Sequence, residues 1–153
     1  MKVLLAHRDP GLRARLRRLV RRLPDVRQVS EASTGKSTIR RARLARPAVA
    51  ILGSDLRGPR CLETVRSIKT IRPRTQFIVL TVRHTQALVR AARRSGVNYC
   101  IPVRTVDVRL SSLVALAYRD YLAVAARSVA RSSRKSRTPR MPVPPALVAR
   151  SRR

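Results

Sequence analysis

The chain has 153 residues, 44% of them hydrophobic, which suffices for one domain with a proper core and argues against wholesale disorder. Its charge is strongly unbalanced, because 36 Lys and Arg residues stand against 7 Asp and Glu, for a net charge of +29. A field of that size attracts polyanions whatever the fold. Aromatic residues make up only 3% of the chain, so a base-stacking surface for single-stranded nucleic acid is poorly supported.

The two cysteines, Cys61 and Cys100, have a spacing that suits neither a zinc site nor a disulfide framework. We expect reduced, partly buried thiols in a cytoplasmic protein. No apolar run reaches the length of a membrane span, and the apolar stretch at 2–5 is too short for the core of a signal peptide.

Strands and helices are predicted to alternate from the N-terminus. The apolar run 2–7 predicts a buried strand. Asp9 and Pro10 then supply an N-cap and a proline at the first helical position, and this helix ends near Pro24. Its apolar residues recur at helical spacing: Leu12, Leu16, Leu19, Val20 and Leu23.

The middle of the chain continues the alternation. A strand is predicted over 26–29, a helix over 34–45 and a strand over 49–52. After a turn at Gly58-Pro59, a third helix carries apolar residues at helical spacing: Leu62, Val65, Ile68 and Ile71. Residues 77–81 give the clearest buried strand in the chain.

The last part adds a helix over 84–94, a strand over 97–101 and a long final helix. This final helix is predicted to begin at an Asp107 N-cap and to continue to about residue 130. Residues 131–153 are basic and rich in Ser and Pro, without an apolar period, and predict a disordered tail. The whole pattern predicts an α/β fold with a flavodoxin-like, doubly wound parallel sheet of five strands in the order 2-1-3-4-5 and helices on both faces.

Residues 34–38 contain the Gly-Lys-Ser of a phosphate-binding loop, but the first glycine of that motif is replaced by Ser30. We interpret this segment as a helix N-cap. His7 and His84 lie far apart in the sequence and have no acidic or nucleophilic partner pattern, so neither is predicted to be catalytic.

Taken together, residues 1–118 resemble the receiver domain of bacterial response regulators, the CheY-like family. The resemblance depends on the order and spacing of six pieces, none of them specific by itself. They are Lys2–Pro10, Val29–Gly35, Arg46-Pro47, Leu62-Glu63, Ile78–Thr81 and Gly96–Asn98.

In active receivers the third strand ends on an aspartate that a partner kinase phosphorylates, and this position is Gly53 here. The register is fixed from both sides, by Pro47 before the strand and by Glu63 after it. Asp55 would therefore need an insertion and a matching deletion to serve as a displaced acceptor, and we expect it to cap or brace its loop instead.

The other positions of the family's phosphorylation site are changed as well. Carboxylates after the first strand bind Mg²⁺ in active receivers, and here those positions match His7 and Arg8, with Asp9 as the next carboxylate. The family lysine matches Val103, and only Thr81 keeps its residue type. The resemblance implies a pseudo-receiver that is not an enzyme, with its Mg²⁺ site lost and no other cofactor.

The leading hypothesis is a phosphorylation-independent receiver-like module in two-component signal transduction, acting by contact with a sensor kinase or an output protein. The alternative is a nucleic-acid-associated protein that binds phosphates without sequence preference through its basic surface and tail. The tail residues concerned are Arg131, Arg134, Lys135, Arg137 and Arg140. A third hypothesis, a decaying paralogue with no selected function, is also compatible with the sequence, and the oligomeric state stays open.

Overall fold

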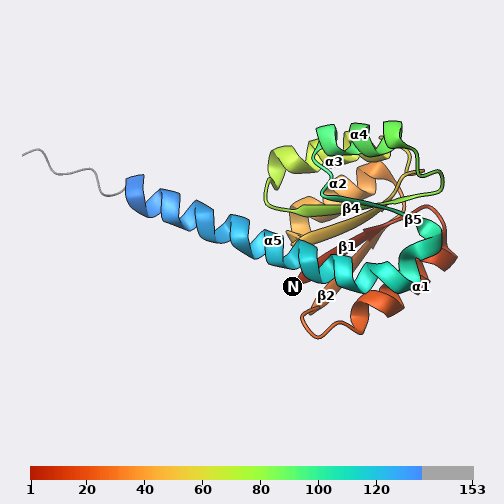
Figure 1. Cartoon of the computed structure of the whole chain (residues 1–153), viewed down its shortest axis with the longest axis horizontal. Helices are drawn as coiled ribbons and strands as arrows, with labels where there is room; N and C mark the ends of the chain where they lie inside the picture. Colours follow the sequence, from red (N-terminus) through yellow and green to blue (C-terminus); the bar gives the residue numbers. More distant parts are fainter. Residues whose placement is uncertain (136–153) are drawn as a thin grey trace, which may run out of the picture.

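A computed structural model describes residues 1–135, and it contains one parallel sheet of five strands in the order β2-β1-β3-β4-β5 (Figure 1). The strands are β1 (Lys2–Ala6), β2 (Gln28–Ala32), β3 (Val49–Gly53), β4 (Gln76–Thr81) and β5 (Tyr99–Pro102). β3 and β4 are buried along their whole length, which explains why the residues between the ends of each strand are all apolar rather than alternating. The predicted fold class and strand order are confirmed.

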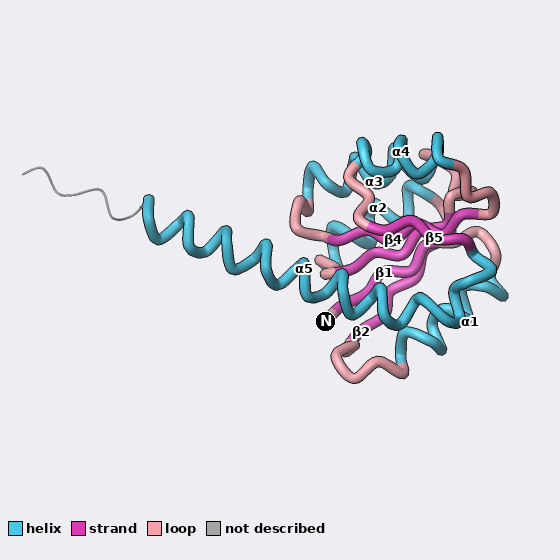
Figure 2. Tube along the Cα trace, in the orientation of Figure 1, coloured by secondary structure: helices cyan, strands magenta, loops and turns pink. Residues whose placement is uncertain are grey.

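Helices cover both faces of the sheet (Figure 2). One core contains Val3 and Leu5 of β1 and is covered by α1 (Pro10–Arg21) and α5 (Val106–Lys135). The other contains Leu4 and Ala6 of β1 and is covered by the remaining three helices. These are α2 (Gly35–Ala45), α3 (Cys61–Ile71) and α4 (Gln86–Ser95). Alternate residues of the same strand therefore supply the two cores.

Two predicted strands are shifted along the chain. β2 was expected over 26–29 and is found two residues later, and β5 was expected from Val97 and begins at Tyr99. Pairing with the neighbouring strand decides both boundaries, since Val29 lies opposite Val3. Val26 and Val97 still pack against the two cores from loops, so their apolar character reports burial rather than strand structure.

Two helix starts also differ from the prediction. α4 begins after Thr85, whose hydroxyl accepts a hydrogen bond from the Leu88 amide at 3.2 Å, so His84 precedes the helix. Asp107 lies in the first turn of α5 and is not its N-cap, because the short 3-10 helix η1 (Val103–Thr105) leads into α5. Its carboxylate instead accepts a hydrogen bond from Arg15 Nε of α1 at 3.0 Å.

α5 is 30 residues long, and only its first half packs on the sheet, burying Val106, Leu110, Leu113, Val114 and Ala117. The second half projects away from the body (Figure 1). It was expected to end near Ala130 but continues to Lys135, since Arg and Lys are good helix formers and no Gly or Pro interrupts them before Pro139. The rest of the predicted tail, 136–153, lies outside the described residues.

Within residues 1–135, no helix combines the length and the apolar character that crossing a membrane requires.

The two thiols differ in burial, which predicts a difference in reactivity. Cys61 is 3% exposed, and burial, with smaller contributions from Cys100 and Asp55, raises the pKa of its thiol to about 12. Cys100 is only partly buried, and burial also raises the pKa of its thiol. Because the thiolate is the reactive form, we expect a disulfide reagent at pH 8 to modify Cys100 in the folded protein and Cys61 only after unfolding. A Cys100→Ser variant that still reacts before unfolding would contradict this order.

Candidate functional site

The carboxyl ends of β1, β3 and β4 meet at one edge of the sheet, where doubly wound folds bind their ligands. His7 follows β1, Gly53 ends β3 and Thr81 ends β4, so the fold brings three of the predicted site residues to this edge. The register supports the same placement, because Ala6 lies opposite Leu52.

The imidazole of His7 lies directly against the backbone of Gly53. A Cβ atom built on Gly53 would be 2.4 Å from His7 Cδ2 and 2.8 Å from His7 Nε2, both too close for real contacts. His7 is only 5% exposed, so it has little room to withdraw. The residue that stands where active receivers carry an acid thus occupies the space that a side chain at position 53 would need.

Hydrogen bonds fix the orientation of His7. The Asp9 amide donates to His7 Nδ1 at 3.0 Å, so the proton of the neutral ring lies on Nε2. His7 Nε2 is 3.6 Å from Asp55 Oδ1, while Arg13 Nη1 donates to the His7 carbonyl at 2.7 Å. The ring is therefore held between the loop that follows β1 and the loop that follows β3.

Asp55 was expected to cap or brace its loop, which stays a prediction, and its carboxylate lies 3.6 Å from His7 Nε2. Its Oδ1 is buried and has no hydrogen-bond partner among the described residues, although the side chain as a whole is 37% exposed. The same oxygen would lie 2.9 Å from a Cβ at position 53. His7, Gly53 and Asp55 thus form one contact cluster, and its third member was not predicted from the sequence.

The side chains of Arg8 and Asp9 do not join this cluster, which Asp9 contacts only through its backbone amide. Arg8 is exposed and takes part in none of the ion pairs within residues 1–135. Asp9 is the N-cap of α1, as predicted, and its Oδ1 accepts hydrogen bonds from the amides of Gly11 at 2.8 Å and Leu12 at 3.4 Å. The one surviving carboxylate after β1 is therefore used to begin a helix.

Thr81 and Val103 are used in packing. The Thr81 hydroxyl donates to the carbonyl of Ile101 at 3.3 Å and lies 3.1 Å from Nδ1 of His84. Val103 lies in η1 and packs against the core beneath α1 and α5. The sequence did not predict the contact between Thr81 and His84. The only available signal was their short separation, three residues across the loop after β4.

The donors at this edge fit Mg²⁺ poorly. His7 and Asp55 offer one imidazole nitrogen and one carboxylate, whereas Mg²⁺ takes oxygen ligands in a near-ideal octahedron. Within residues 1–135, no three His, Cys, Asp or Glu side chains are grouped so that they could hold a metal ion. The loss of the Mg²⁺ site stays a prediction.

The segment 34–38 is a helix N-cap, as interpreted from the sequence. The Thr34 hydroxyl accepts from the Ser37 amide at 3.1 Å. The amides of Gly35 and Lys36 donate to the carbonyls of Arg57 and Gly58, both at 2.7 Å, so the groups that would bind a phosphate are already used. Gly35 is required by close packing, since a Cβ there would be 2.1 Å from the carbonyl oxygen of Pro59.

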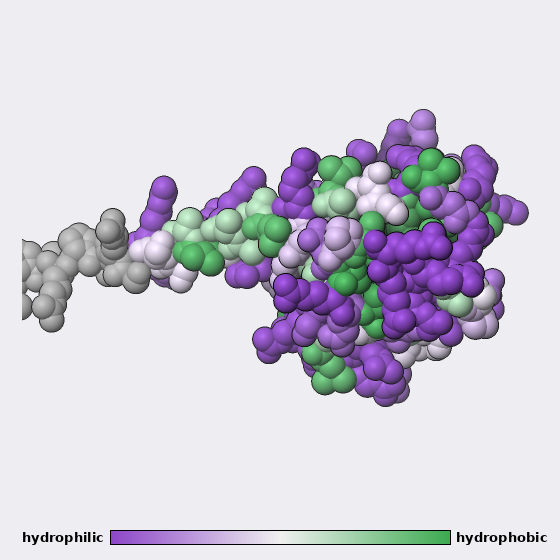
Figure 3. Space-filling view, turned by 90° about the horizontal axis from the view of Figure 1, so that it is seen from below, coloured by the Kyte–Doolittle hydropathy of each residue, from purple (hydrophilic) through white to green (hydrophobic). Residues whose placement is uncertain are grey.

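The basic residues proposed for nucleic acid are only partly described. Arg131, Arg134 and Lys135 lie on the last turns of α5, whereas Arg137 and Arg140 lie outside the described residues. Figure 3 shows that apolar side chains continue along the projecting helix between polar ones. Leu122 and Val129 belong to this apolar set, with exposed fractions of 48% and 66%.

Comparison with known proteins points to response regulators. No family model matches the chain. The nitrate/nitrite response regulator protein NarL of Escherichia coli (strain K12) is 28% identical over 100 residues, which are 65% of this chain and 46% of that protein. The chain thus spans less than half the length of the curated relatives that it matches.

Solved structures give the same answer at the level of the fold. The signal receiver domain of the response regulator NarL from Mycobacterium tuberculosis has a TM-score of 0.72 at 18% identity, covering 77% of this chain and 95% of that one. A LuxR-family two-component response regulator from Aurantimonas sp. SI85-9A1 scores 0.71 at 22% identity, with coverages of 76% and 84%. The response regulator domain of Thermotoga maritima CheB scores 0.70 at 19% identity, with coverages of 78% and 96%. The chain has the fold of CheY-like response-regulator receiver domains, as the resemblance implied.

Proposed function

We propose that this chain is a receiver-like module of a two-component pathway that acts by protein–protein contact, without phosphoryl transfer. The observation that carries the proposal is the packing of His7 against Gly53, with the imidazole 2.4 Å from the site of a Cβ. A receiver needs a carboxylate at this position to accept the phosphoryl group, and here the space is occupied. The cytoplasmic location stays part of the proposal.

The neighbouring groups support the same conclusion. Phosphoryl transfer depends on positioning and on cations that neutralise the developing negative charge. Asp9 is committed to the N-cap of α1, and Val103 offers no charge where the family has a lysine. Asp55, the nearest carboxylate, has one oxygen buried against His7.

The proposed contact surface is the face formed by α4, β5 and α5, which receivers generally use. In this chain a small groove lies there, whose lining combines apolar residues with Asn98, Tyr99, Cys100 and the two arginines Arg93 and Arg109. The apolar residues are Val89, Ala92, Val97, Ile101 and Leu113. An apolar floor with a basic rim fits a partner, such as a sensor kinase or an output protein, that presents an apolar side chain beside acidic residues.

The absence of phosphoryl transfer is tested with radiolabelled acetyl phosphate and Mg²⁺. We expect no stoichiometric label on the natural chain, because position 53 offers no carboxylate and Asp55 Oδ1 is buried. The matched control is Asp55→Asn, which should leave the background unchanged. Label on the natural chain that disappears in Asp55→Asn would identify a displaced acceptor and overturn this part of the proposal.

The contact between His7 and Gly53 is tested by a double-mutant cycle in urea. Gly53→Ala should lower the free energy of unfolding by about 1–3 kcal/mol, because the new methyl group is forced into a buried imidazole. In the His7→Ala background the same change should cost clearly less, since the ring is gone and only Asp55 Oδ1, at 2.9 Å, remains too close to the new methyl group. An equal cost in both backgrounds would contradict the packing.

The contact surface is tested by affinity capture from an extract of the native host. Val89→Asp places a charge in the groove and should abolish capture of the partner, whereas Val108→Asp, at a position of α5 that is 84% exposed, should not. The captured protein should be the same with and without acetyl phosphate. A partner that binds Val89→Asp normally, or only after phosphorylation conditions, would argue against the proposal, and thermal melts check that both variants fold.

A further inference from the structure

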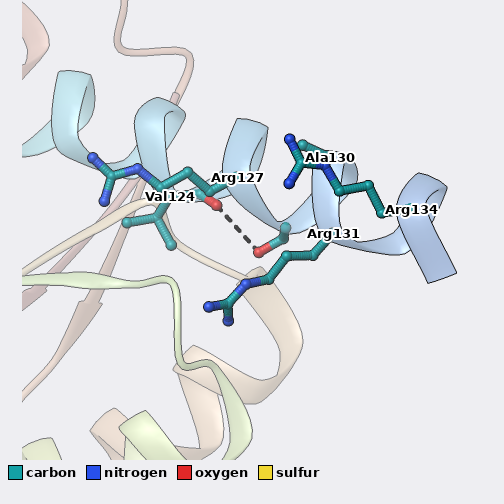
Figure 4. A pocket seen from close by; sticks show the side chains of 6 residues that line it. Val124, Arg127, Ala130, Arg131 and Arg134 are labelled. Atoms are coloured by element: carbon teal, nitrogen blue, oxygen red, sulfur yellow. Dashed lines mark hydrogen bonds between the residues drawn. The ribbon is translucent and has the colours of Figure 1, made fainter.

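Three arginines of the projecting part of α5 share one face of the helix. Arg127, Arg131 and Arg134 are separated by four and three residues, which brings their side chains to the same side. Together with Val124 and Ser128 they line one hollow on the surface (Figure 4). The Ser128 hydroxyl donates to the carbonyl of Val124 at 3.1 Å and is thereby turned back onto the helix.

Three arginines of the body lie where α5 leaves it. Arg46 ends α2, and Arg72 and Arg74 belong to the loop between α3 and β4. They line a second hollow whose wall includes Tyr121 of α5. Tyr121 and Val124 are three residues apart on α5, so the two hollows adjoin along one face of this helix. We call the six arginines the arginine corner.

The charges of the arginine corner are not neutralised within the described chain. None of the six takes part in the ion pairs of residues 1–135, and no acidic residue lines either hollow. The last acidic residue of the sequence, Asp120, accepts a hydrogen bond from the Tyr99 hydroxyl at 2.6 Å. Arg72 Nη2 donates to the carbonyl of Arg43 at 2.8 Å, and its Nε is buried without any partner.

This arrangement suits a ligand with regularly repeated negative charges. From Arg127 to Arg134 the helix rises by about 10 Å. A nucleic-acid strand in a duplex advances by about 3.4 Å per phosphate, so about three phosphates fit along this arm. The body arginines, which line the second hollow together with Tyr121 of α5, give a second arm. Because aromatic residues are only 3% of the chain, contact with the backbone is favoured over stacking on unpaired bases.

We propose that the arginine corner binds the phosphate backbone of duplex DNA without sequence preference. The site is distinct from the predicted basic tail, since four of its members, Arg46, Arg72, Arg74 and Arg127, precede residue 131. It does not rest on the function proposed above, because it uses the opposite edge of the sheet from His7 and Gly53.

The test is the salt dependence of binding of the full chain to a fluorescent random-sequence DNA duplex, measured by anisotropy. Each phosphate contact contributes about 0.9 to the slope of log affinity against log salt. Replacing Arg127, Arg131 and Arg134 by Gln should therefore lower the slope by about 2.7, and replacing Arg46 and Arg74 by about 1.8. The combined variant should lose the sum, about 4.5, if both arms contact one duplex.

The matched control replaces three exposed arginines that line neither hollow, Arg83, Arg90 and Arg94, by Gln, with the same change in net charge. This control should retain the slope of the natural chain. If the slope fell equally in the control and in the α5 variant, the attraction would be diffuse, and the proposed site would be overturned. A fall in slope confined to the double variant Arg137→Gln/Arg140→Gln would also overturn it, because it would assign binding to the tail. Binding of poly-L-glutamate with the same dependence on the five replaced arginines, and no binding of DNA, would assign the corner to an acidic protein.

Discussion

Burial of the central strands on both faces is the constraint on which the other features of this molecule depend. Leu4 and Leu5 are neighbours in β1, and each is completely buried in a different core. Because the strands are parallel and share one register, all their carboxyl ends meet at one edge and all their amino ends at the other. The first edge gathers His7, Gly53 and Thr81, and the second gathers the loops that carry Arg46, Arg72 and Arg74.

At the carboxyl edge, the side chains of His7 and Thr81 and the backbone of Gly53 are packed within the fold. Gly53 and His7 are complementary in shape, since the missing Cβ of one makes room for the ring of the other. Thr81 uses its hydroxyl within the fold, and Val103 adds to a core. Packing or hydrogen bonding in the fold thus involves His7, Gly53, Thr81 and Val103.

The sequence predicted the fold well because periodicity and capping are local signals. The alternation of strands and helices and the Asp9 and Thr34 caps follow from short segments, and the strand order follows from the fold class that this alternation indicates. Strand ends were less accurate, since Val26 and Val97 are apolar but lie outside the ladder. The identity of the residue at position 53 was clear from its register, but its contact with His7 depends on the rotation of one ring, which no local pattern encodes.

The arginine corner was hidden for a different reason. Its two arms are more than fifty residues apart in the sequence, and only the exit of α5 beside the loop between α3 and β4 brings them together. A sequence dense in arginine gives no way to tell which charges converge and which are spread over solvated faces. Convergence matters energetically because several arginines that contact one nucleic acid release several of its condensed counterions in a single binding event. The two edges of the sheet are separated by the length of a strand, about 16 Å. Changes in packing at His7 and changes in charge at the corner should therefore act independently.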